Sequence, residues 1–178
     1  NSGYDVVIVD NLSNSSADVV DNIEKVSGIR PAFEKLDCLD LEGMDKLFTK
    51  YPGIKGIIHF AASKAVGESV QKPLLYYRNN LVSLINLLEL MPKHGVEGII
   101  FSSSCTVYGQ PDVLPVTEEA PIKKAESPYG NTKQINEEII RDTVASGSPI
   151  NAIMLRYFNP IGAHPTALIG ELPNGVPQ

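Results

Sequence analysis

The sequence predicts an α/β protein with a doubly wound parallel sheet, Rossmann-like and incomplete at its N-terminus. Three observations predict it. Short apolar runs alternate along the chain with longer segments whose apolar residues recur at helical spacing. Repeated β-α units of this kind favour a parallel sheet with helices packed on it. The first apolar run ends at Asp10, and no Gly-rich G-x-G-x-x-G turn is present.

Five short apolar runs predict the strands. The first is apolar on both faces, as expected of a buried parallel strand. The third runs from Ile57 to Phe60, and the fourth leads into Ser102, Ser103 and Ser104. The five predicted strands cover residues 6–9, 31–36, 57–60, 99–101 and 151–157.

Helices are predicted between these strands. The first follows a Ser/Asn cluster and carries apolar residues at positions 19, 23 and 26. Asp40 can cap the second, which stops at Pro52-Gly53. A long helix covers residues 73–94, and Gly95 ends it. Its expected apolar face includes Leu74, Tyr77, Leu81, Leu84, Leu88 and Met91.

The last predicted helix begins at a strong start signal. Ser127 suits the N-cap and Pro128 the first helical position, while Gly147 ends the apolar repeat. Tyr129 and Lys133 are four residues apart and should share one face of this helix. A tyrosine has a pKa of roughly 10, which a neighbouring cation lowers. The pair is therefore a candidate general base, although the same spacing also occurs in ordinary surface pairs.

Composition narrows the function. The chain has 178 residues, of which 43% are hydrophobic and 20% charged, as in ordinary globular proteins. Its net charge of −6 and the lack of a basic patch argue against a nucleic-acid partner. No apolar run approaches the roughly 20 residues of a membrane helix, so we expect no membrane partner. Cys38 and Cys105 form no C-x-x-C, which favours a cytoplasmic location. The three histidines lack metal-ligand spacing, and we expect no metal.

Asp10 lies at the carboxyl end of the first strand, where dinucleotide-binding folds place an acidic residue on the adenosine ribose. The alternative role for Asp10 is a turn or N-cap. Because the Gly-rich turn is lacking, we expect residues 1–158 to form a dinucleotide-binding domain without its first strand. Residues 159–178 hold four prolines and three glycines, and we expect them to be a loop.

With these pieces in place, the chain resembles the UDP-galactose 4-epimerase family, within the extended short-chain dehydrogenase/reductase group. The resemblance runs nearly end to end, and its motifs occur in the family's order and spacing. In that family the first strand lies between the strands predicted here at 6–9 and 57–60. The resemblance implies that residues 1–158 form an NAD-binding domain and that residues 159–178 lead toward a substrate domain. The matching motifs are residues 10–15, 59–61, 64–69, 101–104, 106–109, 127–130 with Lys133, 155–160 and 162–165.

The resemblance implies roles for individual residues. Tyr129 would be the base, Ser104 would bond the sugar O4, and Lys133 would bond the nicotinamide ribose. Substrate would contact Ser104, Tyr129 and Asn159. NAD would contact Asp10, Asn11, Leu12, Ser13, Asn14, Ser15, Asp37, Cys38, Phe60, Ala61, Ala62, Ser63, Lys64, Asn79, Ser104, Tyr129, Lys133 and Phe158. Each polar residue in this set also has an ordinary structural alternative, such as capping a strand end or satisfying a loop.

The implied activity is NAD-dependent interconversion of UDP-galactose and UDP-glucose through transient oxidation at C4. Dehydratases of the same group carry an acidic pair after the serine strand, because loss of water needs an additional acid and base. Here residues 104–107 contain no carboxylate, which favours epimerisation. The alternatives are another nucleotide-sugar epimerase or dehydratase, or an inactive truncated fragment. We expect a homodimer for the full-length protein and no activity for this chain alone.

Overall fold

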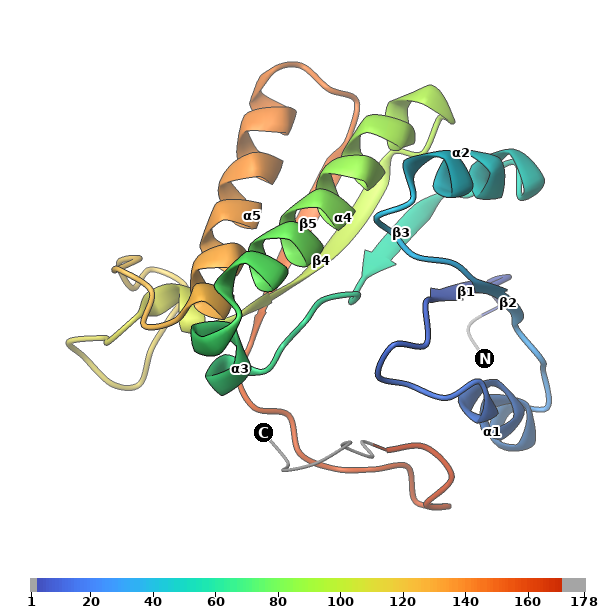
Figure 1. Ribbon diagram of the computed structural model, residues 1–178, viewed down its shortest axis with the longest axis horizontal. Helices are drawn as coiled ribbons and strands as arrows, with labels where there is room; N and C mark the ends of the chain where they lie inside the picture. The colour runs from blue at the N-terminus through green and yellow to red at the C-terminus, as the bar shows by residue number, and fades with distance from the viewer. Residues whose placement is uncertain (1–2, 171–178) are drawn as a thin grey trace.

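The computed structural model describes residues 3–170, and it confirms an α/β protein with parallel, Rossmann-like strand pairing (Figure 1). Helices and strands alternate as predicted. In chain order the elements are β1 (Val7–Asp10), α1 (Asp18–Ser27), β2 (Ala32–Lys35), α2 (Leu41–Lys50), β3 (Gly56–His59), α3 (Val66–Gln71), α4 (Pro73–Lys93), β4 (Gly98–Ser104), the 3₁₀ helix η1 (Cys105–Tyr108), α5 (Pro128–Ala145) and β5 (Asn151–Tyr157).

The strands form two separate sheets, of order β1-β2 and β3-β4-β5. Within residues 3–170, β1 pairs only with β2, and β3 pairs only with β4. A cavity of about 3570 Å³ lies between the two sheets, bordered by residues of both β1 and β3. Ligand pockets usually measure about 300–1,000 Å³, so this space is larger than a single binding site. The gap between β1 and β3 is at the position where the family resemblance implies a further strand.

Helices α4 and α5 lie side by side against one face of β3-β4-β5 (Figure 1). Leu84 and Met91 of α4, Ile140 of α5 and Phe101 of β4 are fully buried there. The opposite face of this sheet is uncovered within the described residues. Its apolar side chains Ile58, Ile153 and Leu155 are 60%, 58% and 37% exposed.

Some boundaries and faces differ from prediction. Leu74 was expected on the apolar face of the long helix but is 81% exposed, whereas Tyr76 is fully buried. The reason is tertiary, because the Tyr76 hydroxyl donates to Glu68 of the unpredicted short helix α3 at 2.9 Å. Strand β4 continues to Ser104, so the three serines lie in the strand rather than after it.

Candidate active site

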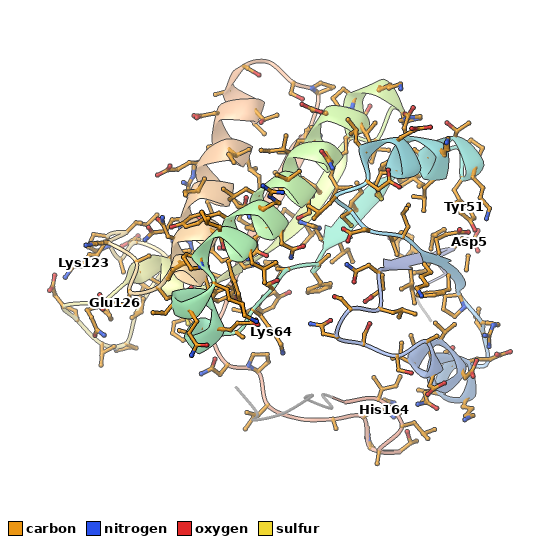
Figure 2. The ribbon with its side chains drawn as sticks, in the orientation of Figure 1. Asp5, Tyr51, Lys64, Lys123, Glu126 and His164 are labelled. Carbon is orange, nitrogen blue, oxygen red and sulfur yellow. The ribbon has the colours of Figure 1, made fainter. Side chains whose placement is uncertain are left out.

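The predicted site residues lie at the carboxyl ends of parallel strands. Asp10 ends β1, Asp37 follows β2, and residues 60–64 follow β3. Ser104 ends β4, and Phe158 follows β5. In open α/β sheets this edge is where ligands bind. Figure 2 shows Lys64 beside α3, on the loop that leaves β3.

Asp10 organises the turn after β1. Its Oδ1 accepts hydrogen bonds from the Leu12 backbone N–H at 2.7 Å and from Ser15 Oγ at 2.8 Å. Leu12 has a φ of 59°, a left-handed conformation that is uncommon for residues other than glycine. The turn role that the sequence left open for Asp10 is therefore real. Both bonds use Oδ1, so a ligand contact through the other oxygen is compatible with it.

The ends of β1 and β2 are joined by a hydrogen bond from Asn11 Nδ2 to Asp37 Oδ2 at 2.9 Å. Beside it, the Cys38 carbonyl accepts from Asn86 Nδ2 of α4 at 2.9 Å. Burial, together with Asp37 and Asp10, raises the pKa of Cys38 to about 11. Its thiol is therefore protonated at neutral pH, which favours a small packing residue over a nucleophile.

The loop after β3 is held by two neighbouring asparagines of α4. Asn79 Nδ2 donates to Ser63 Oγ at 3.1 Å. Asn80 accepts from the Ser63 backbone N–H at 2.8 Å and donates to the Ser63 carbonyl at 2.9 Å. Asn80 also donates to Thr132 of α5 at 3.1 Å. Asn80 is not among the predicted site residues, although an amide on the buried face of an amphipathic helix is a detectable signal.

Tyr129 and Lys133 share one face of α5, as the spacing predicts. Lys133 Nζ lies 5.7 Å from the centroid of the Tyr129 ring. It donates to the Ser102 carbonyl at 2.6 Å, and the residue is only 3% exposed. Burial lowers the pKa of Lys133 to about 8. The side chain therefore remains mostly protonated at pH 7.

Several groups act on the phenol of Tyr129. Burial raises the pKa of Tyr129, whereas the Ser104 side-chain hydrogen bond and the Lys64 charge oppose that rise. Lys133 Nζ is near the Tyr129 ring and bonds the Ser102 carbonyl, and its effect on the phenolate stays a prediction. The Ser104 hydroxyl also accepts from Thr106, at 3.2 Å from the backbone N–H and 3.0 Å from Oγ1.

The cavity between the sheets brings together most of the predicted cofactor residues but not the predicted catalytic ones. Leu12, Ser104, Tyr129, Lys133 and Phe158 lie outside its lining. Site residues within the lining are Asp10, Asn11, Ser13, Asn14, Ser15, Asp37, Cys38, Phe60, Ala61, Ala62, Ser63, Lys64, Asn79 and Asn159.

Across residues 3–170, no three His, Cys, Asp or Glu side chains are grouped so that they could hold a metal ion. Within the same range, no helix combines the length and apolar character needed to cross a membrane. His164, which the sequence placed in a loop, pairs through Nδ1 with Thr166 Oγ1 at 2.8 Å. Residues 171–178, the end of the predicted loop, lie outside the described residues.

The fold defines a Rossmann-like α/β protein whose polar residues collect at the carboxyl edge of parallel strands. The chain matches the NAD dependent epimerase/dehydratase family over residues 1–174, and it belongs to that family.

Individual proteins and solved structures are similar to this chain along nearly its whole length. UDP-glucose 4-epimerase of Bacillus subtilis (strain 168) is 49% identical over 178 residues, which is 100% of this chain and 52% of that protein. The crystal structure of UDP-glucose 4-epimerase from Bifidobacterium longum in complex with NAD+ and UDP superposes with a TM-score of 0.95 at 47% identity, covering 99% of this chain and 52% of that one. The crystal structure of UDP-glucose-4-epimerase from Stenotrophomonas maltophila, with bound NAD and formylated UDP-arabinopyranose, has a TM-score of 0.94 at 46% identity. The match covers 98% of this chain and 52% of that one. This chain thus spans about half the length of these relatives.

Proposed function

We propose that the protein containing this chain is an NAD-dependent epimerase that interconverts UDP-galactose and UDP-glucose by transient oxidation at C4. The observation that carries the proposal is the grouping of Tyr129, Lys133 and Ser104 at the carboxyl edge of the parallel sheet. Similarity to UDP-glucose 4-epimerases along the whole chain supports it.

The residues fit NAD. Asp10, Asn11 and Asp37 form a hydrogen-bonded polar edge at the ends of β1 and β2, suited to ribose hydroxyls. The 60–64 loop lines the same cavity and brings the Lys64 charge, suited to phosphate. When bound, NAD supplies a hydride acceptor and a positive ring charge that favours the Tyr129 phenolate. We propose that these residues hold the cofactor, with Cys38, Asn79 and Phe158 contributing further contacts.

We assign the proton transfer to Tyr129 and Ser104. Tyr129 takes the proton from the sugar O4, and Ser104 bonds the same oxygen and shares that proton. The Ser104 bond and the Lys64 charge each lower the pKa of Tyr129 against the effect of its burial. Lys133 stays charged near neutral pH and its Nζ bonds the Ser102 carbonyl, and we propose that it also bonds a ribose hydroxyl. Asn159 is proposed to contact the diphosphate.

The test is conversion of UDP-galactose to UDP-glucose in a coupled assay with the protein that contains this chain. Replacing Tyr129 by Phe should lower kcat by about 100-fold or more, because the base is lost. The matched control is Tyr51→Phe, which makes the same chemical change at the end of α2 and should leave kcat unchanged. Full turnover in the Tyr129→Phe variant would exclude the assigned base.

The competing substrates are other UDP-sugars. A UDP-Glc/GlcNAc 4-epimerase from Campylobacter jejuni is 35% identical to this chain, with a TM-score of 0.81. Product analysis with UDP-N-acetylglucosamine distinguishes these substrate classes. Formation of a dehydrated sugar would instead support a dehydratase, which the lack of a carboxylate at residues 104–107 argues against.

We also propose a role in galactose metabolism, a cytoplasmic location and a homodimer for the full-length protein. Sedimentation velocity tests the assembly, and fractionation tests the location.

A further inference from the structure

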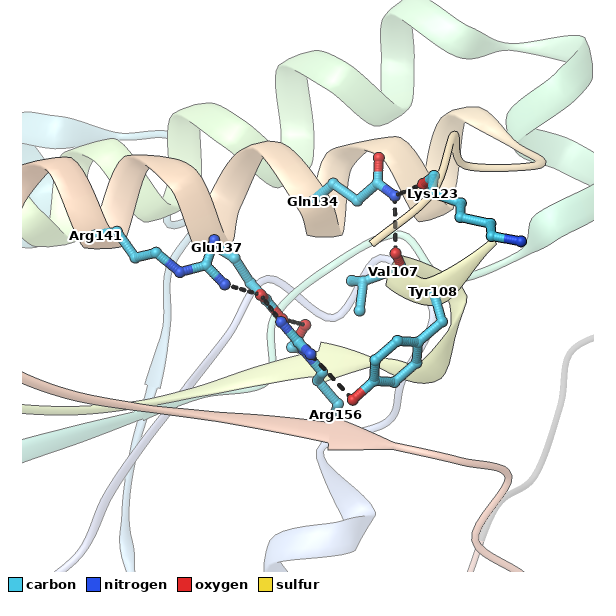
Figure 3. Close-up of polar contacts among 8 residues, drawn as sticks. Val107, Tyr108, Lys123, Gln134, Glu137, Arg141 and Arg156 are labelled. Carbon is cyan, nitrogen blue, oxygen red and sulfur yellow. Dashed lines mark hydrogen bonds and ion pairs between the residues drawn. The ribbon is translucent and has the colours of Figure 1, made fainter. Parts of the chain in front are cut away.

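A buried carboxylate ties α5 to the sheet one helical turn beyond Lys133 (Figure 3). Glu137 is completely inaccessible to solvent. Its Oε1 accepts from Ser103 Oγ of β4 at 2.6 Å and from Arg156 Nε of β5 at 2.9 Å. Its Oε2 accepts from Arg156 Nη2 at 2.7 Å. The carboxylate thus joins three elements through a two-point pair with Arg156, a geometry that fixes orientation as well as distance.

Glu137 is charged in this setting. Burial by itself would raise its pKa, but hydrogen bonds from Arg156 and Ser103 outweigh burial and lower the pKa. Arg141 also contacts Oε2, at 2.5 Å, but its side chain is 44% exposed and it lies on α5 itself. Arg141 therefore cannot connect the helix to the sheet. The bonds of Glu137 to the sheet are those from Ser103 and Arg156.

Arg156 carries the connection onward to η1. Its Nη1 donates to the Tyr108 hydroxyl at 3.0 Å, and its guanidinium lies 4.8 Å from the centroid of the Tyr108 ring. Ser103 and Arg156 are opposite each other in the β4-β5 register. Ser104 lies between Ser103 and η1 in the chain. Ser103, which precedes Ser104, therefore bonds the Glu137 carboxylate directly. The η1 helix, which follows Ser104, is connected to the same carboxylate through Tyr108 and Arg156.

We propose that Glu137 is a positioning residue that holds Ser104 of β4 against Tyr129 of α5 by bonding Ser103 and Arg156 together. This inference rests on the proposed function. Lys133 also joins α5 to β4, through its hydrogen bond to the Ser102 carbonyl. Lys133 also binds the ribose in the proposed mechanism, whereas Glu137 makes no contact assigned to substrate or cofactor. Its bonds can therefore keep the two elements in register throughout the reaction.

The test is Glu137→Gln in the protein that contains this chain. Glutamine keeps the size of the side chain but cannot accept both Arg156 bonds and the Ser103 bond at full strength. We expect kcat to fall about tenfold or more, because small displacements of reacting groups are costly. KM and the content of bound NAD should stay within about threefold of the parent. The control is Arg141→Gln, which removes the ion pair that the same carboxylate makes on its solvent-exposed side. This variant should leave kcat unchanged.

Two further measurements separate positioning from general destabilisation. The charged and titratable groups near Tyr129 are Lys64, Cys105, Tyr76 of α4 and Lys133 of α5, and Ser104 bonds its hydroxyl. Weakening the Ser104 bond removes an interaction that lowers the pKa of Tyr129. The acid limb of the pH–rate profile should therefore move to higher pH in Glu137→Gln. Ultraviolet titration, taken as the difference from the corresponding Tyr129→Phe protein, should show the same shift without any turnover.

The outcomes are distinct. If the parent protein does not turn over UDP-sugars, the proposed function fails, and the phenolate titration still decides the role of Glu137. If Glu137→Gln does not fold, Arg156→Lys replaces it, since lysine keeps the charge but loses the two-point pair and the Tyr108 bond. A parental kcat with an unmoved phenolate pKa would overturn the inference. So would a loss of kcat that follows loss of bound NAD.

Discussion

Gly109 shows how one backbone position shapes the region next to Ser104. It follows η1 with a φ of 59°, and a Cβ added to it would lie 2.6 Å from the Lys124 carbonyl oxygen. Both the conformation and the space therefore require glycine. We expect Gly109→Ala to lower the free energy of unfolding by about 3 kcal/mol. The change is measured by urea denaturation.

Gly53 is the matched control for that prediction. Its φ is 85°, but a Cβ there meets no atom within 4 Å. Gly53→Ala should cost only the conformational strain, about 1 kcal/mol. Equal losses at the two glycines would show that the contact with Lys124 is relieved by movement of that loop.

His59 gives the fold a predictable pH dependence. Its side chain is 4% exposed, and burial together with the Lys133 charge lowers the pKa of His59 to about 4. An unfolded histidine titrates near pH 6.5, so the unfolded chain binds the extra proton first. The stability due to neutral His59 is complete above about pH 6.5 and is lost as the pH falls toward 4.

Between pH 7.5 and 5 this linkage should cost about 2 kcal/mol of unfolding free energy. The measurement is a series of urea denaturations across that range. His59→Asn should remove most of the slope, because asparagine does not titrate. A slope that persists unchanged in the variant would assign the pH dependence to other groups.

At the scale of the element, the start of α5 depends on one cap. Ser127 Oγ accepts from the Gly130 backbone N–H at 3.1 Å, and both residues are buried. Ser127→Ala should lower the free energy of unfolding by about 1 kcal/mol. Because Tyr129 lies in the same first turn, kcat of the proposed reaction should fall as well. Thermal melting and the coupled assay measure the two effects.

The N-cap of α2 provides the comparison. Asp40 Oδ1 accepts from the Gly43 N–H at 2.9 Å in the same way, but it is far from Tyr129 in the chain and carries no site residue. Asp40→Ala should cost a similar free energy and leave kcat unchanged. A fall in kcat for Asp40→Ala would mean that activity follows stability rather than cap geometry.

Local signals predicted the elements well, because caps and periodicity are local. Ser127 with Pro128 and Asp40 each mark a helix start that the structure confirms. What escaped prediction depends on contacts between elements. Tyr76 of α4 bonds Glu68 of α3, and the bond of Asn80 to Thr132 of α5 is known only once both helices are placed. The roles of the site residues remain predictions.

Electrostatics were the least predictable from spacing. The i,i+4 rule places Tyr129 and Lys133 on one face, but it does not predict which other groups reach the phenol. These include Ser104 at the end of β4 and Lys64 in the loop after β3, and the Ser102 carbonyl binds Lys133. Glu137 likewise appears in sequence as an ordinary helical acid. Only β4 and β5 supply the partners that give it a role.

For the whole molecule, the break between the two sheets leaves strands with few partners. Both β1 and β3 border the cavity with one unpaired side each within residues 3–170. The uncovered face of β3-β4-β5 adds exposed apolar side chains. Unpaired strand edges and exposed apolar patches favour association. We therefore expect the isolated 178-residue chain to self-associate and to bind NAD poorly, because the cofactor edge spans the break.

Ile58 and Ile153 are the residues through which to test this. Each is aligned with Ile100 across the register, and they are 60% and 58% exposed. Replacing both by threonine keeps strand propensity but removes apolar surface. Sedimentation velocity of the isolated chain should show less association in the double variant. Ile29→Thr is the control, since Ile29 is 62% exposed but lies outside any strand, and it should change little. If the parent chain is monomeric and calorimetry shows tight NAD binding, the break between the sheets neither promotes association nor weakens cofactor binding.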